Sequence, residues 1–202
     1  MFENAFGYQV EAPANIRIVF MWLCQDVASL QSKWDFYMEL YGKEENTELL
    51  SALAPWSFNI IEESLRDDMT MAICRLSDPP VSGRDQENLS LETLVKRCTD
   101  IPNLDMQLKS FKEACKPLRI WRHKRVGHND LNTKISPKEN PLPGINKNQI
   151  DQILTLAKGF LNTISFRYAG GQLVFHTISR GGAEELIFWL KAGREHHSRD
   201  EE

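Results

Sequence analysis

Residues 16–42 read IRIVFMWLCQDVASLQSKWDFYMELYG, and their apolar side chains recur at alternating gaps of four and three. Such a series lies along one face of an α-helix, because about 3.6 residues complete each turn. Gly42 is a typical helix terminator. We therefore predict a long helix that packs against other helices through one apolar stripe. The stripe consists of Ile16, Phe20, Leu23, Val27, Leu30, Trp34, Tyr37 and Tyr41.

The same periodicity extends over most of the remaining chain, which predicts an all-α fold. Pro79 and Pro80 end one expected helix, because proline cannot continue a helix. Residues 131–148 contain several prolines and no apolar period, so we predict a loop there. The piece Gln172 to Thr177 can extend as a strand but has no sheet to join. Further helices are expected at Trp56 to Leu76, around Leu91 to Val95, from about Leu104 onward, at Ile150 to Ile164 and at Ala183 to Leu190.

Length and composition predict one compact domain in a cytoplasmic protein. A chain of 202 residues with 42% hydrophobic content can bury a core. We expect residues 1–130 to form a helical bundle, 131–148 a proline-containing loop, and 149–202 C-terminal helices packed on the same domain, with a disordered tail at 194–202. The apolar run Ile18 to Cys24 is too short to span a bilayer and lacks a preceding basic region, so we expect no signal peptide and no membrane contact. The cysteines form no Cys-x-x-Cys pair, which predicts reduced, buried thiols and no metal site. They are Cys24, Cys74, Cys98 and Cys115.

The strongest functional signal is the ten-residue segment WRHKRVGHND, from Trp121 to Asp130. It gathers three cations and two histidines in a chain whose net charge is −4. Guanidinium groups suit phosphate oxygens and histidine moves protons near neutral pH, so the segment favours a phosphodiester as its ligand or substrate. The alternative is structural, because a helix dipole alone favours cations at a helix C-terminus by roughly 0.3–1 kcal/mol per charge.

Arg122 and His128 cannot complete a site on one continuous helix. They would lie roughly 120° apart around the axis and about 9 Å apart along it. Gly127 can loosen or end the helix before His128 and let the imidazole turn away. Cleavage of a phosphodiester needs both a base and an acid, and one copy supplies one well-placed proton-transfer group, so we expect a twofold dimer to bring two copies together. The helix stripe expected to contact the partner is Leu108, Phe111, Cys115 and Leu118.

The motif resembles a known family signature. Arg122, a polar His123, four further residues and His128 resemble the Arg-x4–6-His signature of the HEPN superfamily of all-helical domains. Two upstream segments, Arg75–Pro80 (RLSDPP) and Asn88–Leu91 (NLSL), stand in the order seen in the AbiU-like, abortive-infection branch. The resemblance covers roughly Ile16 to Asp130. It implies a HEPN-like bundle of long antiparallel helices, to which the C-terminal helices are an addition.

The resemblance also implies an activity, that of a dimeric, metal-independent endoribonuclease of toxin type without a cofactor. Arg122 would stabilise the transition state, His128 would transfer the proton, and His123 would orient the site by hydrogen bonding. The second protomer would supply its own copy, and the product would end in a 2′,3′-cyclic phosphate. The residues expected to hold RNA phosphates are Arg119, Lys124 and Arg125.

The expected partners are RNA, a second copy of the chain, and an antitoxin or a nucleotidyltransferase. Some HEPN toxins carry a tyrosine two residues after the histidine, which a nucleotidyltransferase modifies, whereas this chain has Asp130 there. The alternative function is a catalytically inactive HEPN-type dimer that binds RNA, a nucleotide or a protein.

Other polar residues have simpler structural interpretations. We expect Arg75 and Asp78 to form an ion pair at a helix end, with a role in shaping the site as the alternative. The segment Ser179–Gly182 is expected to form a turn and a cap, with an anion cradle as the alternative. The carboxylates expected on a solvated helix face, with a contact to the motif as the alternative, are Glu62, Glu63, Asp67 and Asp68.

Histidines outside the motif have no ligand spacing, so we assign them no metal. They are His176, His196 and His197. The large aromatic residues are interpreted as core or interface groups and not as platforms for bases. They are Trp34, Trp56, Phe188 and Trp189.

Overall fold

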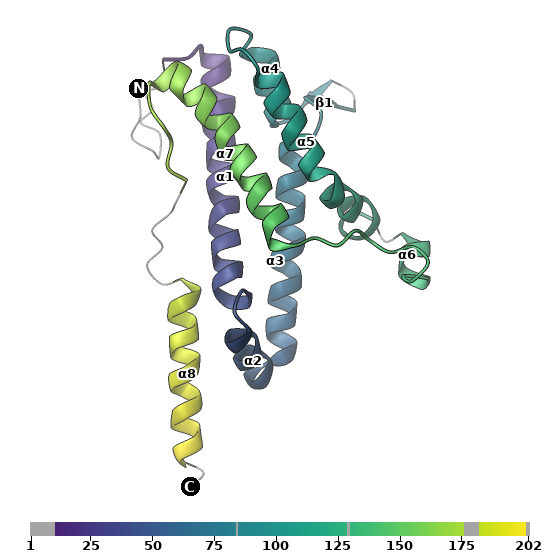
Figure 1. Cartoon of the computed structure of the whole chain (residues 1–202), viewed down its shortest axis with the longest axis vertical. Helices are drawn as coiled ribbons and strands as arrows, with labels where there is room; N and C mark the ends of the chain where they lie inside the picture. The colour runs from purple at the N-terminus through teal and green to yellow at the C-terminus, as the bar shows by residue number, and fades with distance from the viewer. Residues whose placement is uncertain (1–10, 84, 129, 176–181, 201–202) are drawn as a thin grey trace. The chain divides into compact units, whose positions relative to one another are not determined.

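A computed structural model of the chain describes residues 11–83, 85–128, 130–175 and 182–200, with the side chains of the last helix described as far as His196. These residues form an all-α structure with one pair of two-residue strands (Figure 1). The prediction of an all-α fold is confirmed. The helices are α1 (Ala14–Tyr41), α2 (Glu44–Leu53), α3 (Pro55–Leu76), α4 (Leu91–Arg97), α5 (Leu104–Trp121), the π-helical turn η1 (Arg122–Val126), α6 (Leu131–Ile135), α7 (Lys147–Ala169) and α8 (Ala183–Asp200), and the strands are β1 (Val81–Ser82) and β2 (Gln86–Glu87).

Four details differ from the sequence expectations. The short helix α6 lies inside the segment predicted to be a loop, and a small hairpin, β1–β2, follows α3. Helix α2 (Glu44–Leu53) is not among the expected helices, whereas residues 172–175 form no strand, in keeping with the lack of a sheet for them to join. Helix α8 extends to Asp200, beyond the predicted Leu190. Periodicity fails at these places because the elements are too short to complete an apolar pattern or are too polar to show one.

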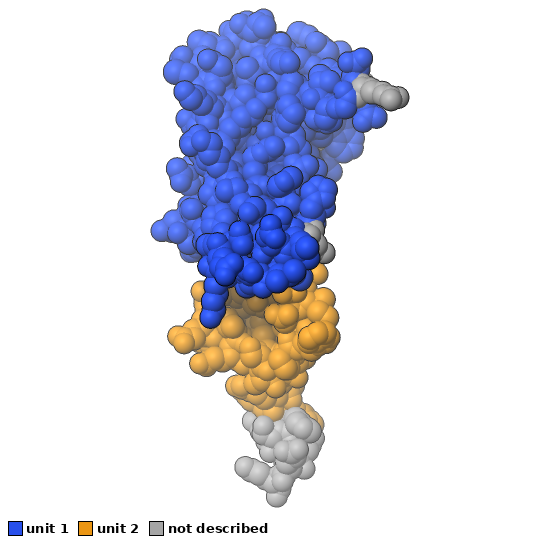
Figure 2. Space-filling model, turned by 90° about the vertical axis from the view of Figure 1, so that its right-hand side faces the viewer, with its two compact units in different colours: residues 1–29, 70–175 blue, residues 30–69, 176–202 orange. Residues whose placement is uncertain are grey.

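The chain forms two compact units, which are coloured separately in Figure 2. Unit 1 contains residues 1–29 and 70–175, and unit 2 contains residues 30–69 and 176–202. Helices α1 and α3 each contribute residues to both units. The domain boundaries expected from the sequence stay a prediction.

In unit 1, helices α5 and α7 pack side by side and run in opposite directions (Figure 1). Phe111 of α5 and Phe160 of α7 are completely buried, and such burial contributes roughly 1.5–3 kcal/mol per side chain. Helix α7 begins with a capping box, in which Asn146 and Gln149 each satisfy the backbone N–H of the other. It ends at Gly170, whose φ of 67° would strain any residue with a side chain.

The apolar stripe of α5 belongs to this core. Leu108, Phe111, Cys115 and Leu118 are all buried, and α5 packs against α4 and α7 of the same chain. The prediction that this stripe contacts a second protomer is therefore wrong. Periodicity shows that a stripe is buried, but it does not distinguish burial within a chain from burial between chains.

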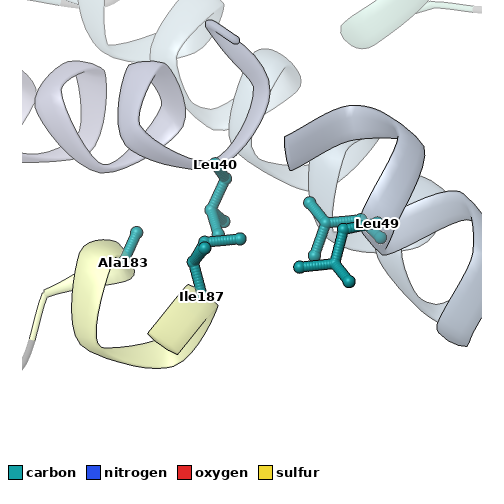
Figure 3. Packing of buried hydrophobic residues seen from close by; sticks show 5 residues of the cluster. Leu40, Leu49, Ala183 and Ile187 are labelled. Atoms are coloured by element: carbon teal, nitrogen blue, oxygen red, sulfur yellow. The ribbon is translucent and has the colours of Figure 1, made fainter. Parts of the chain in front are cut away.

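In unit 2, the beginning of α8 packs against the end of α1 and against α2. Figure 3 shows side chains of Leu40, Leu49, Ala183 and Ile187 gathered in one buried cluster, which also includes Leu50. The Glu39 carboxylate accepts hydrogen bonds from the backbone N–H groups of Ala183 and Glu184. A negative charge at a helix N-terminus interacts favourably with the helix dipole, so Glu39 stabilises the start of α8.

The remaining sequence predictions about burial are largely confirmed. All four cysteines are buried and carry free thiols. Trp34 is buried, whereas Trp56, Phe188 and Trp189 are exposed and so are not core residues. In the part of the chain that the structure describes, no helix is both long and apolar enough to cross a membrane.

Candidate functional site

The motif begins where α5 widens into η1. The backbone N–H of Gly127 donates to the Arg122 carbonyl at 2.7 Å, and the N–H of Asp130 donates to the Lys124 carbonyl at 3.0 Å. These bonds span five and six residues, whereas an α-helix spans four. A Cβ on Gly127 would lie 3.1 Å from the Arg122 carbonyl oxygen, so glycine permits this close approach. The helix ends before His128, as predicted from Gly127.

Arg119 and Arg122 converge on one carboxylate. Arg122 Nη1 donates to Asp78 Oδ1 at 2.7 Å, and Arg119 Nη1 donates to the same oxygen at 3.1 Å. Arg119 also donates to Ser77 Oγ at 3.0 Å. The ion pair predicted between Arg75 and Asp78 is wrong, because the described ion pairs of Asp78 are those with Arg119 and Arg122. The alternative interpretation, that Asp78 helps to shape the site, fits these contacts.

The hairpin after α3 holds Asp78 in place. Asn88 Nδ2 donates to the Pro79 carbonyl at 2.7 Å, and its backbone N–H donates to the Pro80 carbonyl at 2.8 Å. The Asn88 carbonyl in turn accepts from Thr93 Oγ1 of α4 at 2.6 Å. The segment Asn88–Leu91 therefore fixes the backbone that follows Asp78, which gives a physical reason for the two upstream segments to occur together.

His123 and His128 lie against each other. Their ring centroids are 5.6 Å apart and the ring planes are inclined by 82°, so the edge of one ring meets the face of the other. Both side chains are exposed to solvent. Helical periodicity does not predict this contact, because residues five apart on an α-helix lie on different faces.

Asp130 is a structural cap beside the histidine pair. Its carboxylate accepts from the backbone N–H of Thr133 at 2.9 Å and from Thr133 Oγ1 at 2.7 Å, and so begins α6. These hydrogen bonds lower the pKa of Asp130, and the nearby charges of Lys124 and His123 lower it further. The carboxylate is therefore ionised next to the motif at neutral pH.

Arg125 and Trp121 form a second contact at the motif. The Arg125 guanidinium lies 5.4 Å from the centroid of the Trp121 ring, a cation–π arrangement. Trp121 Nε1 donates to the Pro143 carbonyl at 2.7 Å, which ties the segment after α6 to the end of α5.

The predicted site residues thus fall into two neighbouring groups. The arginine group is Arg119 and Arg122 on Asp78, and the imidazole group is His123 and His128. No described hydrogen bond joins the side chains of Arg122 and His128. The hydrogen bonds of Asp78 with Arg119 and Arg122 are the contacts that the sequence did not predict. The sequence pointed to Asp78 through its place in the segment Arg75–Pro80 alone.

Burial keeps the thiols near the arginine group inert. It raises the pKa of Cys74 to about 11, although the Arg122 and Arg119 charges oppose the shift, and it raises the pKa of Cys115 to about 12. A thiol is nucleophilic only as a thiolate, so neither cysteine is a nucleophile near neutral pH. The described residues contain no group of three or more histidine, cysteine, aspartate or glutamate side chains placed to hold a metal ion.

The other sequence candidates belong to unit 2, and some of them lie outside the described residues. Glu63, Asp67 and Asp68 are exposed, so the prediction of a solvated helix face is confirmed for these three. Glu62 is half-buried and accepts from the Tyr37 hydroxyl. His176, residues 179–181 and the His197 side chain lie outside the described residues.

Comparison with known families establishes the relationship. The model of the HEPN family AbiU2 matches residues 17–186. The chain belongs to the AbiU2 family of HEPN domains. The match extends beyond Asp130 and includes α6, α7 and the first four residues of α8, so more of the chain belongs to the family region than the resemblance in the sequence covered. No curated protein and no solved structure matches the chain.

Proposed function

We propose that this HEPN protein is a metal-independent endoribonuclease of the toxin or abortive-infection type, acting in the cytoplasm. The observation that carries the proposal is the turn Arg122–His128, in which a guanidinium oriented by Asp78 is followed in sequence by two exposed imidazoles in mutual contact, in a chain of the AbiU2 family. This set of groups is suited to attack of a ribose 2′-hydroxyl on the adjacent phosphodiester, because it combines proton transfer with charge stabilisation.

The cations have two roles in the proposed reaction. Arg122 stabilises the charge that builds on the phosphoryl oxygens. A single Arg122 donor bonds to Asp78 among the described residues, so most of the fork of five N–H donors remains for phosphate. Arg119, Lys124 and Arg125 bind flanking phosphates without regard to base sequence.

The working form is a homodimer in which the second protomer contributes its own copy of the motif to a composite site. Exposed apolar residues next to the motif support this assembly. Leu131 and Ile135 of α6 are 68% and 69% exposed and stand four residues apart on one helix face. A partner copy would remove both from water. This surface replaces the α5 stripe, which the chain buries in its own core.

The proposed function is tested with purified protein and single-stranded RNA in EDTA. Wild-type protein is expected to cut the RNA and to leave 2′,3′-cyclic phosphate ends, whereas His128→Ala is expected to lose the activity. His196→Ala is the matched control, because it removes an exposed histidine outside the motif. Full activity of His128→Ala, or a strict requirement for Mg²⁺, overturns the mechanism.

A non-catalytic HEPN dimer that binds RNA, a nucleotide or a protein is the second candidate. The observation that favours it is the contact between Arg122 and Asp78, which neutralises part of the positive charge. This candidate predicts RNA binding without cleavage. A nucleotidyltransferase partner would need a target other than position 130, because Asp130 has no hydroxyl to modify and its carboxylate caps α6.

A further inference from the structure

We infer that His123 and His128 of one chain form the acid–base pair of the reaction, so that His123 is a catalytic residue and not only an orienting one. This inference rests on the proposed function and changes the account of the site. In the composite arrangement the second proton-transfer group comes from the partner, whereas here each chain carries both.

The π-helical turn is what makes the pair possible. On an α-helix, residues five apart lie roughly 140° apart around the axis, so their side chains diverge. A turn closed by a hydrogen bond that spans five residues is wider than an α-helical turn, so residues five apart lie closer together around its axis. His123 and His128 are separated by five, and their ring centroids lie 5.6 Å apart. The bond from the Gly127 N–H to the Arg122 carbonyl closes this turn.

The spacing of the rings suits a single phosphodiester. The attacking 2′-oxygen and the leaving 5′-oxygen lie on opposite sides of one phosphorus atom, and each must approach its imidazole nitrogen to roughly 2.6–3.2 Å. The ring centroids are 5.6 Å apart and both rings are exposed, so a phosphate that approaches from solvent can reach both imidazoles once the rings turn from their edge-to-face contact toward its two oxygens. Arg122, next to His123 in sequence, supplies the positive charge beside them.

Packing alone does not account for the ring contact. Both imidazoles are exposed, and an aromatic pair gains most when its rings are buried. A Cβ on Gly127, the residue before His128, would lie 3.1 Å from the Arg122 carbonyl oxygen, so glycine lets the turn close without displacing that carbonyl.

The Asp130 carboxylate assigns the two roles. Asp130 lies close enough to His123 for their charges to interact, and Lys124 is the other charged group acting on that carboxylate. We therefore assign the acid to His123, the imidazole next to the Asp130 carboxylate, and the base to His128.

Each proton and bond in the step is accounted for. Neutral His128 takes the proton of the 2′-hydroxyl as the bond from the 2′-oxygen to phosphorus forms. The bond from phosphorus to the 5′-oxygen breaks, and protonated His123 gives its proton to that oxygen. The products are a 2′,3′-cyclic phosphate and a free 5′-hydroxyl, and exchange with water restores both imidazoles.

The experiment compares two RNA substrates that differ in one atom. In the second substrate, sulfur replaces the bridging 5′-oxygen at the cleaved linkage, and a thiolate leaves without being protonated. With ordinary RNA, His123→Ala and His123→Asn are expected to lower kcat by roughly 10²-fold or more with little change in KM. With the sulfur substrate, both His123 variants are expected to approach wild-type rates, whereas His128→Ala stays inactive.

An orienting role predicts a different pattern. If His123 only orients the site, asparagine preserves a hydrogen bond, so His123→Asn approaches wild-type activity and His123→Ala loses equally on both substrates. Either result overturns the inference. Because His123 is exposed, these variants are expected to keep the wild-type circular dichroism spectrum and thermal midpoint.

Mixed dimers separate this inference from the composite site. A wild-type chain paired with a His123→Ala/His128→Ala chain is expected to keep about half the activity, because one complete pair remains. Loss of nearly all activity shows that each site needs an imidazole from both chains and overturns the inference alone. A wild-type protein that does not cut RNA in EDTA overturns the proposed function first.

Discussion

Arg122 donates a hydrogen bond to Asp78 Oδ1 at 2.7 Å, and Arg119 donates to the same oxygen at 3.1 Å. One carboxylate thus orients two guanidinium groups and cancels one of their two charges. Hydrogen bonds between ionised groups are shorter and stronger than neutral ones, so the arrangement holds Arg122 in a defined place before substrate arrives. Asp78 therefore fixes the position of Arg122, and its negative charge weakens the attraction of the site for RNA.

Replacing Asp78 separates these two effects. We expect Asp78→Asn to lower kcat by about 10- to 10²-fold, because Arg122 loses its fixed position. We expect KM to fall, because the site gains one unit of positive charge toward a polyanion. The free energy of unfolding should drop by only about 1 kcal/mol or less, since the ion pairs are partly exposed. Steady-state kinetics and urea unfolding of the same preparation measure all three quantities.

Asp68→Asn is the matched control for this variant. Asp68 forms an ion pair with Lys33 in unit 2, and its removal changes the net charge by the same amount. Its kcat and KM should stay at wild-type values. Equal kinetic changes in the two variants would show that net charge, and not the position of Arg122, causes the effect.

Gly127 tests whether the π-helical turn matters for activity. An alanine Cβ there would lie 3.1 Å from the Arg122 carbonyl oxygen, so the carbonyl must move by a few tenths of an ångström. We expect Gly127→Ala to lower kcat about tenfold or more through this displacement, while alanine's helix propensity keeps the stability change within about 1 kcal/mol.

Gly159→Ala provides the comparison for Gly127. Gly159 lies inside α7, and a Cβ at that position meets no atom within 4 Å. Alanine is favoured over glycine in a helix interior by roughly 0.5–1 kcal/mol, so this variant should be more stable and equally active. If Gly127→Ala also keeps full activity, the turn geometry is not needed for catalysis.

The sequence predicted the helices because their apolar stripes repeat over many turns, as in Ile16 to Tyr41. It did not predict η1, because a five-residue turn is set by hydrogen bonds that leave no period in the sequence. The contact between His123 and His128 depends on that turn and was missed with it. The sequence predicted an ion pair between Asp78 and Arg75, because they stand three residues apart. The ion pairs that Asp78 forms depend on the approach of α5 to the end of α3, which the sequence does not show.

Lys124 tests the proposed electrostatic binding of RNA. Each phosphate contact contributes about 0.7 to the slope of log binding constant against log salt for single strands. We expect Lys124→Ala to reduce that slope by about this amount and to weaken binding to all RNA sequences alike. Fluorescence anisotropy with His128→Ala as the background measures binding without cleavage.

Lys109→Ala is the control for Lys124. Lys109 is exposed on α5 and precedes Lys124 by 15 residues, which separates their Cα atoms by roughly 20 Å at about 1.5 Å per helical residue. Charges act over roughly 10 Å at 0.1 M salt, so Lys109 lies outside the range of the site. Its removal should leave the salt slope unchanged. A sequence-dependent loss in Lys124→Ala would mean that the lysine contacts a base and not a phosphate.

Alkaline pH should destabilise the protein through the thiols beneath the arginine group. Burial raises the pKa of Cys74 to about 11 and that of Cys115 to about 12, whereas a thiol in the unfolded chain titrates near roughly 8.5. Above pH 8.5 the unfolded chain loses these protons first, so unfolding becomes easier until the folded pKa is reached. Each thiol then lowers the free energy of unfolding by roughly 1.4 kcal/mol per pH unit. Urea unfolding between pH 8.5 and 9.5, below the ordinary tyrosine pKa of about 10, should show this loss, and Cys74→Ala/Cys115→Ala should show a shallower slope. An unchanged slope in the double variant would mean that other groups govern the alkaline loss of stability.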